Sequence, residues 1–115
     1  MTGPTDDDYA ELAALISRLA RAGFALPGTL LERRTSCRKP GCRCTADPPA
    51  LHGPYYQWTR KRDGKTVTIN LTPDQATRYQ PWFTNARDLR DTLTAIEKLT
   101  LRIAARTENW PENQP

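Results

Sequence analysis

The chain has 115 residues, a formal net charge of +4, three cysteines and a single histidine. This length predicts one domain with a modest core. The odd number of cysteines and the acidic first residues argue against a secreted disulfide framework, and no apolar run is long enough to cross a membrane, so we expect a cytoplasmic protein.

The first predicted element is a helix over residues 6–22. Thr5 suits the N-cap position, and three aspartates follow it, where carboxylates interact favourably with the helix dipole. Gly23 stands where a left-handed C-terminal cap would end the helix. Apolar residues recur at steps of three and four, which predicts a buried face made of Tyr9, Leu12, Leu15, Ile16 and Leu19.

After a turn at Pro27-Gly28, residues 29–36 are predicted to form a strand that leads into a cysteine cluster. The cluster has the spacing Cys-x4-Cys-x-Cys-x7-His, and its prolines and glycines predict turns that fold the segment back on itself. Three thiolates and an imidazole suit a closed tetrahedral zinc site, which can fold a loop that has no core of its own. We therefore predict a Zn²⁺ ion held by Cys37, Cys42, Cys44 and His52.

The cysteine spacing leaves two other interpretations open, because it differs from the double Cys-x2-Cys pattern of well-known zinc fingers. In the first, the thiols are unliganded and His52 is exposed to solvent. In the second, Cys42 and Cys44 take part in redox or iron–sulfur chemistry.

A β-hairpin is predicted next, because Asp63-Gly64 is typical of a two-residue type I′ turn between residues 55–62 and 65–71. Such a turn pairs Arg62 with Lys65 and Trp58 with Ile69, and it gathers the apolar residues on one face. The opposite face is then predicted to carry Tyr55, Gln57, Thr59, Lys61, Thr66, Thr68 and Asn70.

The last predicted element is a long helix. Thr72 and Gln75 form a capping-box pattern, and apolar residues keep steps of three and four from Ala76 to about Arg106, with a kink expected at Pro81. This apolar stripe is longer than the first helix. Either the sheet covers its N-terminal half while the first helix covers the rest, or a second copy pairs along the uncovered part as a homodimer. The predicted fold is α+β, a single zinc-stapled domain over residues 1–107 with a flexible tail at 108–115.

Positive charge is concentrated in residues 33–65, which carry nine basic residues against Asp47 and Asp63, whereas the rest of the chain is net acidic. Such a patch predicts contact with a nucleic acid, DNA before RNA, although a basic segment can also be only a solvated surface. The residues predicted to contact phosphates or base edges are Arg38, Lys39, Arg43, Gln57, Thr59, Arg60, Lys61, Arg62, Lys65, Thr68 and Asn70.

Two stretches resemble a known family: residues 30–44, reading LLERRTSCRKPGCRC, and residues 52–58, reading HGPYYQW. Similar chains are small intracellular proteins with a Cys-x4-Cys-x-Cys loop, a His-Gly-Pro-Tyr-Tyr segment, a Gly-Lys hairpin turn and a leucine-rich terminal helix. The family is labelled a domain of unknown function and is sometimes met beside transposases or recombinases. The resemblance implies a metal-binding loop and a recombinase or transposase as partner, but no catalytic residue. Pro81 departs from the uninterrupted helix of similar chains.

Together these features predict a small zinc-containing accessory or regulatory protein that binds nucleic acid. The resemblance links this predicted protein to mobile-element recombination. The alternative is a protein–protein adaptor that dimerises or binds a partner through its long helix, with no nucleic-acid binding. An enzyme is not expected, because the chain has one histidine, no spaced carboxylate pair and no glycine-rich phosphate loop.

Overall fold

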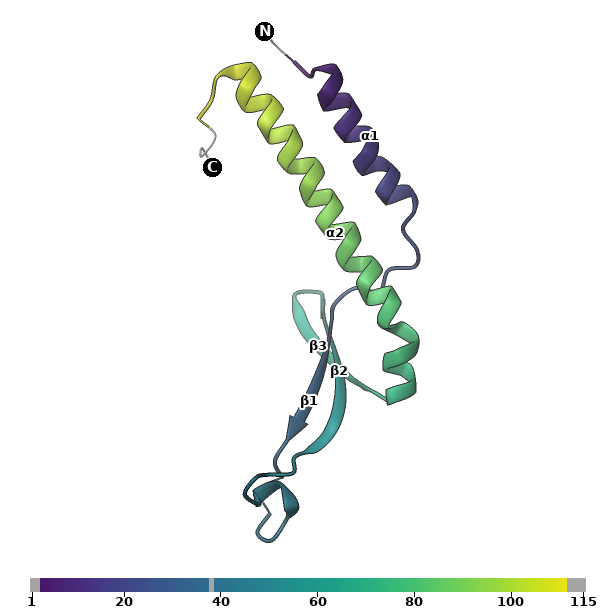
Figure 1. Cartoon of the computed structure of the whole chain (residues 1–115), viewed down its shortest axis with the longest axis vertical. Coiled ribbons are helices and arrows are strands. Elements are labelled where there is room, and N and C mark those ends of the chain that lie inside the picture. Colours follow the sequence, from purple (N-terminus) through teal and green to yellow (C-terminus); the bar gives the residue numbers. More distant parts are fainter. Residues whose placement is uncertain (1–2, 38, 112–115) are drawn as a thin grey trace. The chain divides into compact units, whose positions relative to one another are not determined.

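The computed structural model describes residues 3–37 and 39–111. Its elements, shown in Figure 1, are α1 (Asp6–Ala20), β1 (Thr29–Thr35), the short 3₁₀ turn η1 (Arg43–Thr45), β2 (His52–Arg62), β3 (Lys65–Leu71) and α2 (Pro73–Glu108). The predicted α+β order of helix, loop, antiparallel sheet and long helix is confirmed. None of the helices in the described ranges combines the length and the apolar character that crossing a membrane requires.

The chain divides into two compact units. We call Met1–Ala25 with Thr84–Pro115 the helical unit and Leu26–Phe83 the sheet unit. α2 contributes its first turns to the sheet unit and the remainder to the helical unit. The single zinc-stapled domain over residues 1–107 stays a prediction.

In the helical unit, α1 begins with a capping box that also ties it to α2. The Thr5 hydroxyl accepts a hydrogen bond from the Asp8 backbone N–H (3.2 Å), and the Asp8 carboxylate accepts one from the Thr5 N–H (2.8 Å). Asp8 also pairs with Arg106 in the last turns of α2. The hydrogen bond from Arg106, followed by that from the Thr5 backbone, lowers the pKa of Asp8. The predicted N-cap at Thr5 is confirmed.

The C-terminal end of α1 differs from the prediction. The helix ends at Ala20, and the cap residue Arg21 keeps a right-handed backbone with φ of −90°. Gly23 does not have a positive φ, so the predicted left-handed cap is wrong. Gly23 instead permits a close approach: a Cβ there would lie 2.8 Å from Nδ2 of Asn85, which donates a hydrogen bond to the Phe24 carbonyl.

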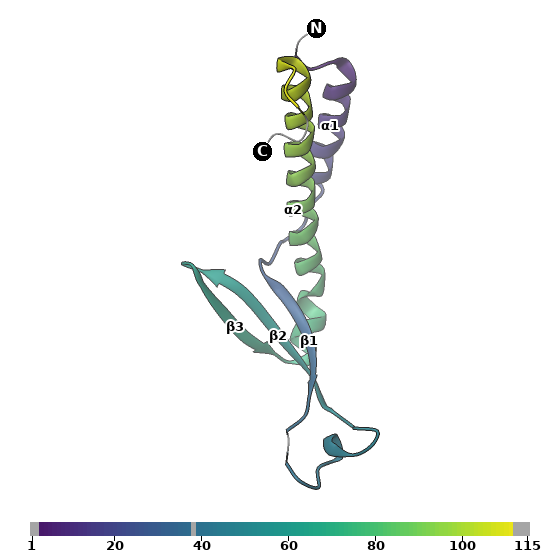
Figure 2. The same ribbon diagram turned by 90° about the vertical axis from the view of Figure 1, so that its left-hand side faces the viewer.

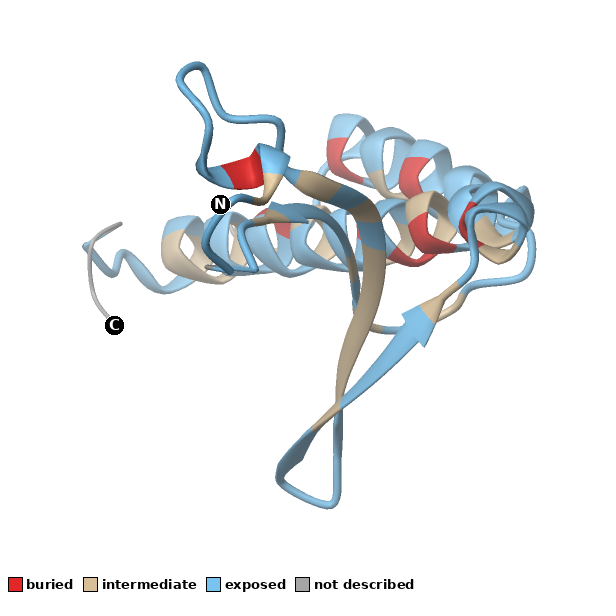
Figure 3. Ribbon diagram, turned by 90° about the horizontal axis from the view of Figure 1, so that it is seen from below, coloured by how far each residue is buried: buried red, intermediate tan, exposed pale blue. Residues whose placement is uncertain are grey.

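Few residues of the helical unit are buried, and Figure 3 shows how sparse the buried positions of the chain are. Leu15 of α1 and Leu99 of α2 are buried, and Leu99 is only 2% exposed. The predicted burial is wrong for three positions of the apolar seams, which are exposed: Tyr9, Ile16 and Leu93. Among the described residues of this unit, α1 and α2 have no other helix or strand beside them, so each covers less of its partner than a full apolar face.

The two ends of α2 are capped. Thr72 and Gln75 exchange side chain to backbone hydrogen bonds (2.9 and 3.1 Å), which confirms the predicted capping box. The helix continues through Pro81 to Glu108, and the kink stays a prediction. Asn109 then has φ of +60°, and the Trp110 N–H donates to the Ala105 carbonyl (2.9 Å), the arrangement of a Schellman cap. The predicted tail therefore starts within this cap, and its residues 112–115 lie outside the described part of the chain.

The sheet unit contains three antiparallel strands in the order β1-β2-β3 (Figure 2). The predicted hairpin register is confirmed, with Arg62 opposite Lys65 and Trp58 opposite Ile69. Asp63 and Gly64 both have positive φ, +52° and +79°, as a type I′ turn requires. β1 occupies the other edge of β2.

The first turns of α2 cover the apolar face of the sheet. Trp58 packs edge-to-face on Phe83 of α2, with ring centroids 6.0 Å apart. The indole Nε1 of Trp58 donates to the Pro27 carbonyl (2.8 Å). The sheet thus covers the N-terminal part of the α2 seam, which is the first of the two predicted alternatives, and the homodimer stays a prediction.

Gly28 is the glycine at which an added Cβ would clash most severely with its surroundings. It has φ of +101°, and a Cβ would lie 2.4 Å from the carbonyl oxygen of Thr59 and 2.8 Å from Nε1 of Trp58. Backbone strain alone should cost about 1–3 kcal/mol at this position, and the clash adds to it. We therefore expect Gly28→Ala to lower the free energy of unfolding by at least this amount, measured by urea denaturation. Gly41→Ala is the matched control, since Gly41 also has a positive φ, +78°, but nothing within 4 Å. Equal losses of unfolding free energy in the two variants would show that the clash at Gly28 does not contribute to the destabilisation.

Candidate metal centre and polar sheet face

The loop between β1 and β2 is folded by turns that its sequence encodes. The Cys42 backbone N–H donates to the Lys39 carbonyl (3.2 Å) across Pro40-Gly41, and the positive φ of Gly41 fits position three of a type II turn. The predicted turn at Pro40-Gly41 is confirmed. Directly after it, η1 carries Cys44 as its central residue.

A β-bulge brings His52 to this loop. Arg33 pairs with Tyr55, but Thr35 pairs with His52, so β2 has one more residue than β1 between the two pairs. Gly53 lies in the bulge with φ of +123°, and a Cβ there would lie 2.7 Å from the carbonyl oxygen of Arg33. In an unbroken ladder Thr35 would face Gly53. The bulge therefore puts the imidazole-bearing residue at the end of the sheet, beside the loop.

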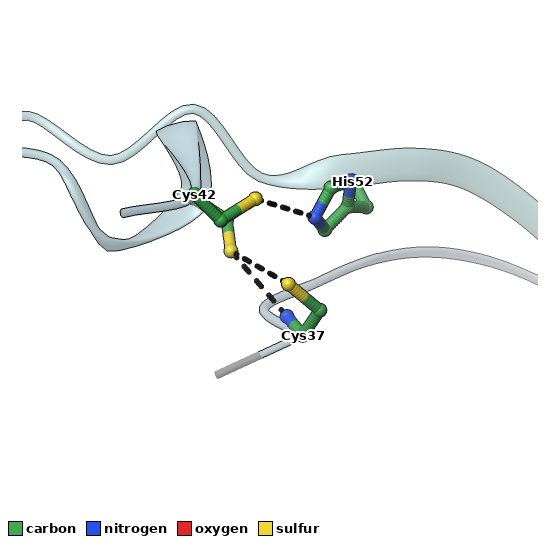
Figure 4. A group of neighbouring side chains, drawn as sticks. Cys37, Cys42 and His52 are labelled. Carbon is green, nitrogen blue, oxygen red and sulfur yellow. Dashed lines mark hydrogen bonds between the residues drawn. The ribbon is translucent and has the colours of Figure 1, made fainter. Parts of the chain in front are cut away.

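The ligand atoms of Cys37, Cys42, Cys44 and His52 all lie within 4.8 Å of one another. The sulfurs of Cys37 and Cys44 are 3.5 Å apart, and the Cys42 sulfur is 3.2 Å from Nε2 of His52 (Figure 4). Tetrahedral zinc, with Zn–S near 2.3 Å and Zn–N near 2.0–2.1 Å, separates two sulfurs by about 3.8 Å and a sulfur from a nitrogen by about 3.6 Å. These two pairs thus lie within a few tenths of an ångström of the tetrahedral spacings, the remaining pairs lie within 4.8 Å, and the four side chains could hold a metal ion.

Hydrogen bonds favour the thiolate of the buried Cys44. The Ser36 hydroxyl and the Cys37 backbone N–H both donate to its sulfur, each at 3.4 Å. The Ser36 bond is the main cause that lowers the pKa of Cys44 to about 6, and burial opposes it. The Lys39 backbone lowers the pKa of Cys37, but the Cys44 hydrogen bond, burial and Cys42 outweigh it and raise the pKa overall. Cys44 therefore offers an ionised ligand near neutral pH, whereas a metal would have to displace a proton from Cys37.

The residues predicted to contact nucleic acid lie in several places. Lys39 and Arg43 are exposed in the loop, and Lys61, Arg62 and Lys65 are exposed at the hairpin end of the sheet. Arg38 lies outside the described residues. Cross-strand pairing places the remaining polar candidates on one face of the sheet, away from α2 and together with Arg33: Gln57, Thr59, Thr68 and Asn70. We call Arg33, Tyr55, Gln57, Thr59, Lys61, Thr66, Thr68 and Asn70 the polar face.

Hydrogen bonds across the strands order part of the polar face. Arg33 donates to Gln57 (3.3 Å), the hydroxyls of Thr59 and Thr68 are 3.3 Å apart, and Lys61 donates to Thr66 (2.9 Å). Sequence reasoning missed Arg33 as a member of this surface, because a hairpin turn specifies the register of β2 and β3 but nothing local specifies how β1 pairs with β2. The partner that orients Cys44, Ser36, was also missed.

Arg60 lies on the opposite face from these residues. Its guanidinium carbon is 4.9 Å from the ring centroid of Trp58, and its Nε is buried with no hydrogen-bond partner among the described residues. The cation–π contact places this arginine with the apolar face that α2 covers. Arg60 is thus on the face opposite the polar face, and the register puts Arg62 and Lys65 on that same side of the sheet.

Residues 7–80 match the family model for a domain of unknown function, DUF6788. The chain belongs to the DUF6788 family. The matched segment contains the four cysteine and histidine residues of the metal cluster, all three strands and the first turns of α2. The predicted membership of a domain-of-unknown-function family is confirmed, and the DUF6788 description carries no activity. Neither the curated proteins nor the solved structures contain a match to the chain.

Proposed function

We propose that this DUF6788 protein is a small DNA-binding accessory or regulatory protein, in which a zinc ion holds the basic loop beside the polar face of the sheet. The observation that carries the proposal is the sheet register. Pairing of the three strands gathers side chains with amide, hydroxyl and basic groups on the face opposite α2. The cluster of four soft-to-borderline ligands lies at the end of the same sheet.

The metal has a structural role in this proposal. Three cysteines and one histidine fill the four positions of tetrahedral zinc, so the site is closed and leaves no position for a substrate. Zinc would join Cys37 at the end of β1 to His52 at the start of β2, through the two cysteines of the loop. A reducing compartment is part of the proposal, because oxidised thiols cannot ligate zinc.

The polar face and the loop contribute differently to DNA binding. Antiparallel strands fit the major groove of B-DNA, where glutamine and asparagine amides can reach base edges. Exposed lysines and arginines of the loop and the hairpin turn, such as Lys39, Arg43 and Lys65, neutralise phosphates, and these contacts position the protein without reading sequence. A recombinase or transposase acting on the same DNA is the partner we propose.

We expect binding to duplex DNA to weaken steeply with salt. Contacts to about five phosphates correspond to a slope of roughly −4 to −5 when log affinity is plotted against log salt concentration. Lys65→Gln removes an exposed cation beside the hairpin turn and should reduce the magnitude of the slope by about one. Lys98→Gln is the matched control, because Lys98 is exposed on α2 in the helical unit. Fluorescence anisotropy over a salt series measures the slopes, and a slope near zero for the unmodified protein would exclude the proposal.

Exposed apolar side chains of the helical unit favour a second candidate, the adaptor or homodimer. Leu93 and Leu101 of α2 are 54% and 69% exposed. A dimer through this helix predicts a mass twice the 13.0 kDa of the chain in native mass spectrometry. Leu101→Glu should then restore the single-chain mass, because a buried carboxylate would be unpaired. Asp91→Lys should not, because Asp91 is exposed at least about 80° around the helix from both leucines. Identical dimer fractions in the two variants would count against this surface.

A further inference from the structure

A hollow of about 500 Å³ lies at one edge of the sheet, where β3 ends before its neighbour β2 does. β3 ends at Leu71, opposite Tyr56, whereas β2 continues to His52 at the metal cluster. Nothing in β3 therefore pairs with Tyr55 or with the bulge. The hollow is walled by Arg33 from β1, by Asn70 from β3 and by Pro73 from the start of α2, and all of these residues belong to the sheet unit.

The hollow offers a stacking surface. Tyr55 lines it and is 49% exposed, a large fraction for an aromatic residue in the middle of a strand. Pro54 and Pro73 add apolar groups beside the tyrosine. An accessible aromatic side chain at a mixed polar and apolar site suits a flat, polarisable ligand, and every nucleobase has such a π-face.

The remaining lining groups suit the edge of a base and a phosphate. Asn70 and Gln57 face each other across the strands, and the Asn70 amide makes no hydrogen bond to a described residue, so its donor and acceptor are both available. Arg33 uses one N–H to hold Gln57 and keeps others that can pair bidentately with a phosphate. The volume also lies within the range of ordinary ligand pockets.

We propose that this hollow is a binding site for one unpaired nucleotide of a DNA strand, with the base stacked on Tyr55, its edge bonded to Asn70 and Gln57, and its phosphate held by Arg33. This inference rests on the proposed DNA binding and makes it more specific. A base inside a duplex must first be unstacked to enter such a site, whereas a base that is already unpaired enters at little cost. The preferred DNA is therefore one with a bulge, flap or frayed end.

The test compares two labelled duplexes of equal length, one fully paired and one with a single unpaired nucleotide at its centre, at the same salt concentration. The zinc-loaded full chain should bind the bulged duplex about 5- to 150-fold more tightly, the range expected for stacking one base on an aromatic side chain. Tyr55→Ala and Asn70→Ala should remove this preference, because each should weaken binding to the bulged duplex much more than binding to the paired duplex. Tyr55→Phe should keep most of it, because the phenyl ring still stacks.

The matched control is Thr66→Ala, a residue of the polar face that does not line the hollow. This variant should retain the full preference for the bulged duplex. Equal affinities of the unmodified protein for both duplexes overturn the inference and leave DNA binding intact, whereas salt-independent or absent binding to both overturns the proposed function as well. A preference that survives in Tyr55→Ala and Asn70→Ala also overturns the inference, because it would come from the flexibility of the bulged DNA. Far-ultraviolet circular dichroism confirms that each variant is folded.

Discussion

If the four-residue cluster holds the zinc ion that we propose, chelation is expected to lower the melting temperature of this protein by roughly 20 °C or more. The loop between β1 and β2 buries only Cys44 among its described residues, so it has no core of its own. Structural zinc contributes apparent free energies of about 10–16 kcal/mol in zinc-finger peptides, comparable to the whole stability of a small domain. Each kcal/mol corresponds to about 4–8 °C in a domain of up to 100 residues, so even a small share of that energy shifts the transition clearly. Native mass spectrometry should show one zinc per chain before chelation.

Ligand variants separate the metal from other contributions of the loop. Cys44→Ser should lose stoichiometric zinc, whereas Ala50→Ser, an exposed residue of the same loop, should keep it. His52→Ala should weaken binding, and His52→Cys should restore it, because a thiolate also ligates zinc. The ligands must be deprotonated, so zinc affinity should fall as the pH is lowered, first because protons compete for Cys37, whose pKa is raised, and then more steeply below about 6, the pKa of Cys44. A protein without stoichiometric metal that melts at an unchanged temperature in chelator would refute the metal centre.

Without metal, the sign of the pH dependence follows from the same thiol. The pKa of Cys44 is lowered from an ordinary 9.0 to about 6 in the folded chain, so the folded state favours the thiolate. The resulting stabilisation is complete above pH 9 and is lost as the pH falls through 6. A stability profile of the metal-free protein between these limits should therefore rise with pH, and Ser36→Ala should flatten it.

The second large effect is expected at Leu99. Its side chain is 2% exposed in the core of the helical unit, so truncation to alanine removes buried methyl groups and leaves a cavity. We expect Leu99→Ala to lower the free energy of unfolding by about 2–5 kcal/mol in urea denaturation. Leu101→Ala is the matched control, because it makes the same change on the same helix at a residue that is 69% exposed. That variant should cost less than about 0.5 kcal/mol, and similar losses in both would mean that a partner covers Leu101.

Elements with a local chemical signal could be predicted from the sequence. Asp63-Gly64 determines the turn and hence the register of β2 with β3, and Thr5 and Thr72 mark the starts of both helices through their own hydrogen bonds. Burial could not be predicted in the same way. Ile16 follows the helical period of its neighbours, but it is exposed because the helical unit supplies only one neighbouring helix.

The candidate site shows the same division. The four metal ligands could be proposed from residue type and spacing, since turns at proline and glycine return the chain on itself. The bulge at Gly53 could not, because it depends on how β1 pairs with β2, a contact between segments about twenty residues apart. For the same reason Arg33 was missed as part of the polar face and of the hollow beside it.

The bulge at Gly53 also lies between the metal cluster and the hollow. His52 is adjacent to this glycine on one side, and Pro54 and Tyr55, which line the hollow, follow on the other. Because only Gly53 and Pro54 separate His52 from Tyr55, we expect a change in how the imidazole is held to affect the position of the tyrosine. Removing zinc should therefore also reduce the preference for DNA with an unpaired nucleotide. In that case the ion would influence recognition as well as stabilise the fold.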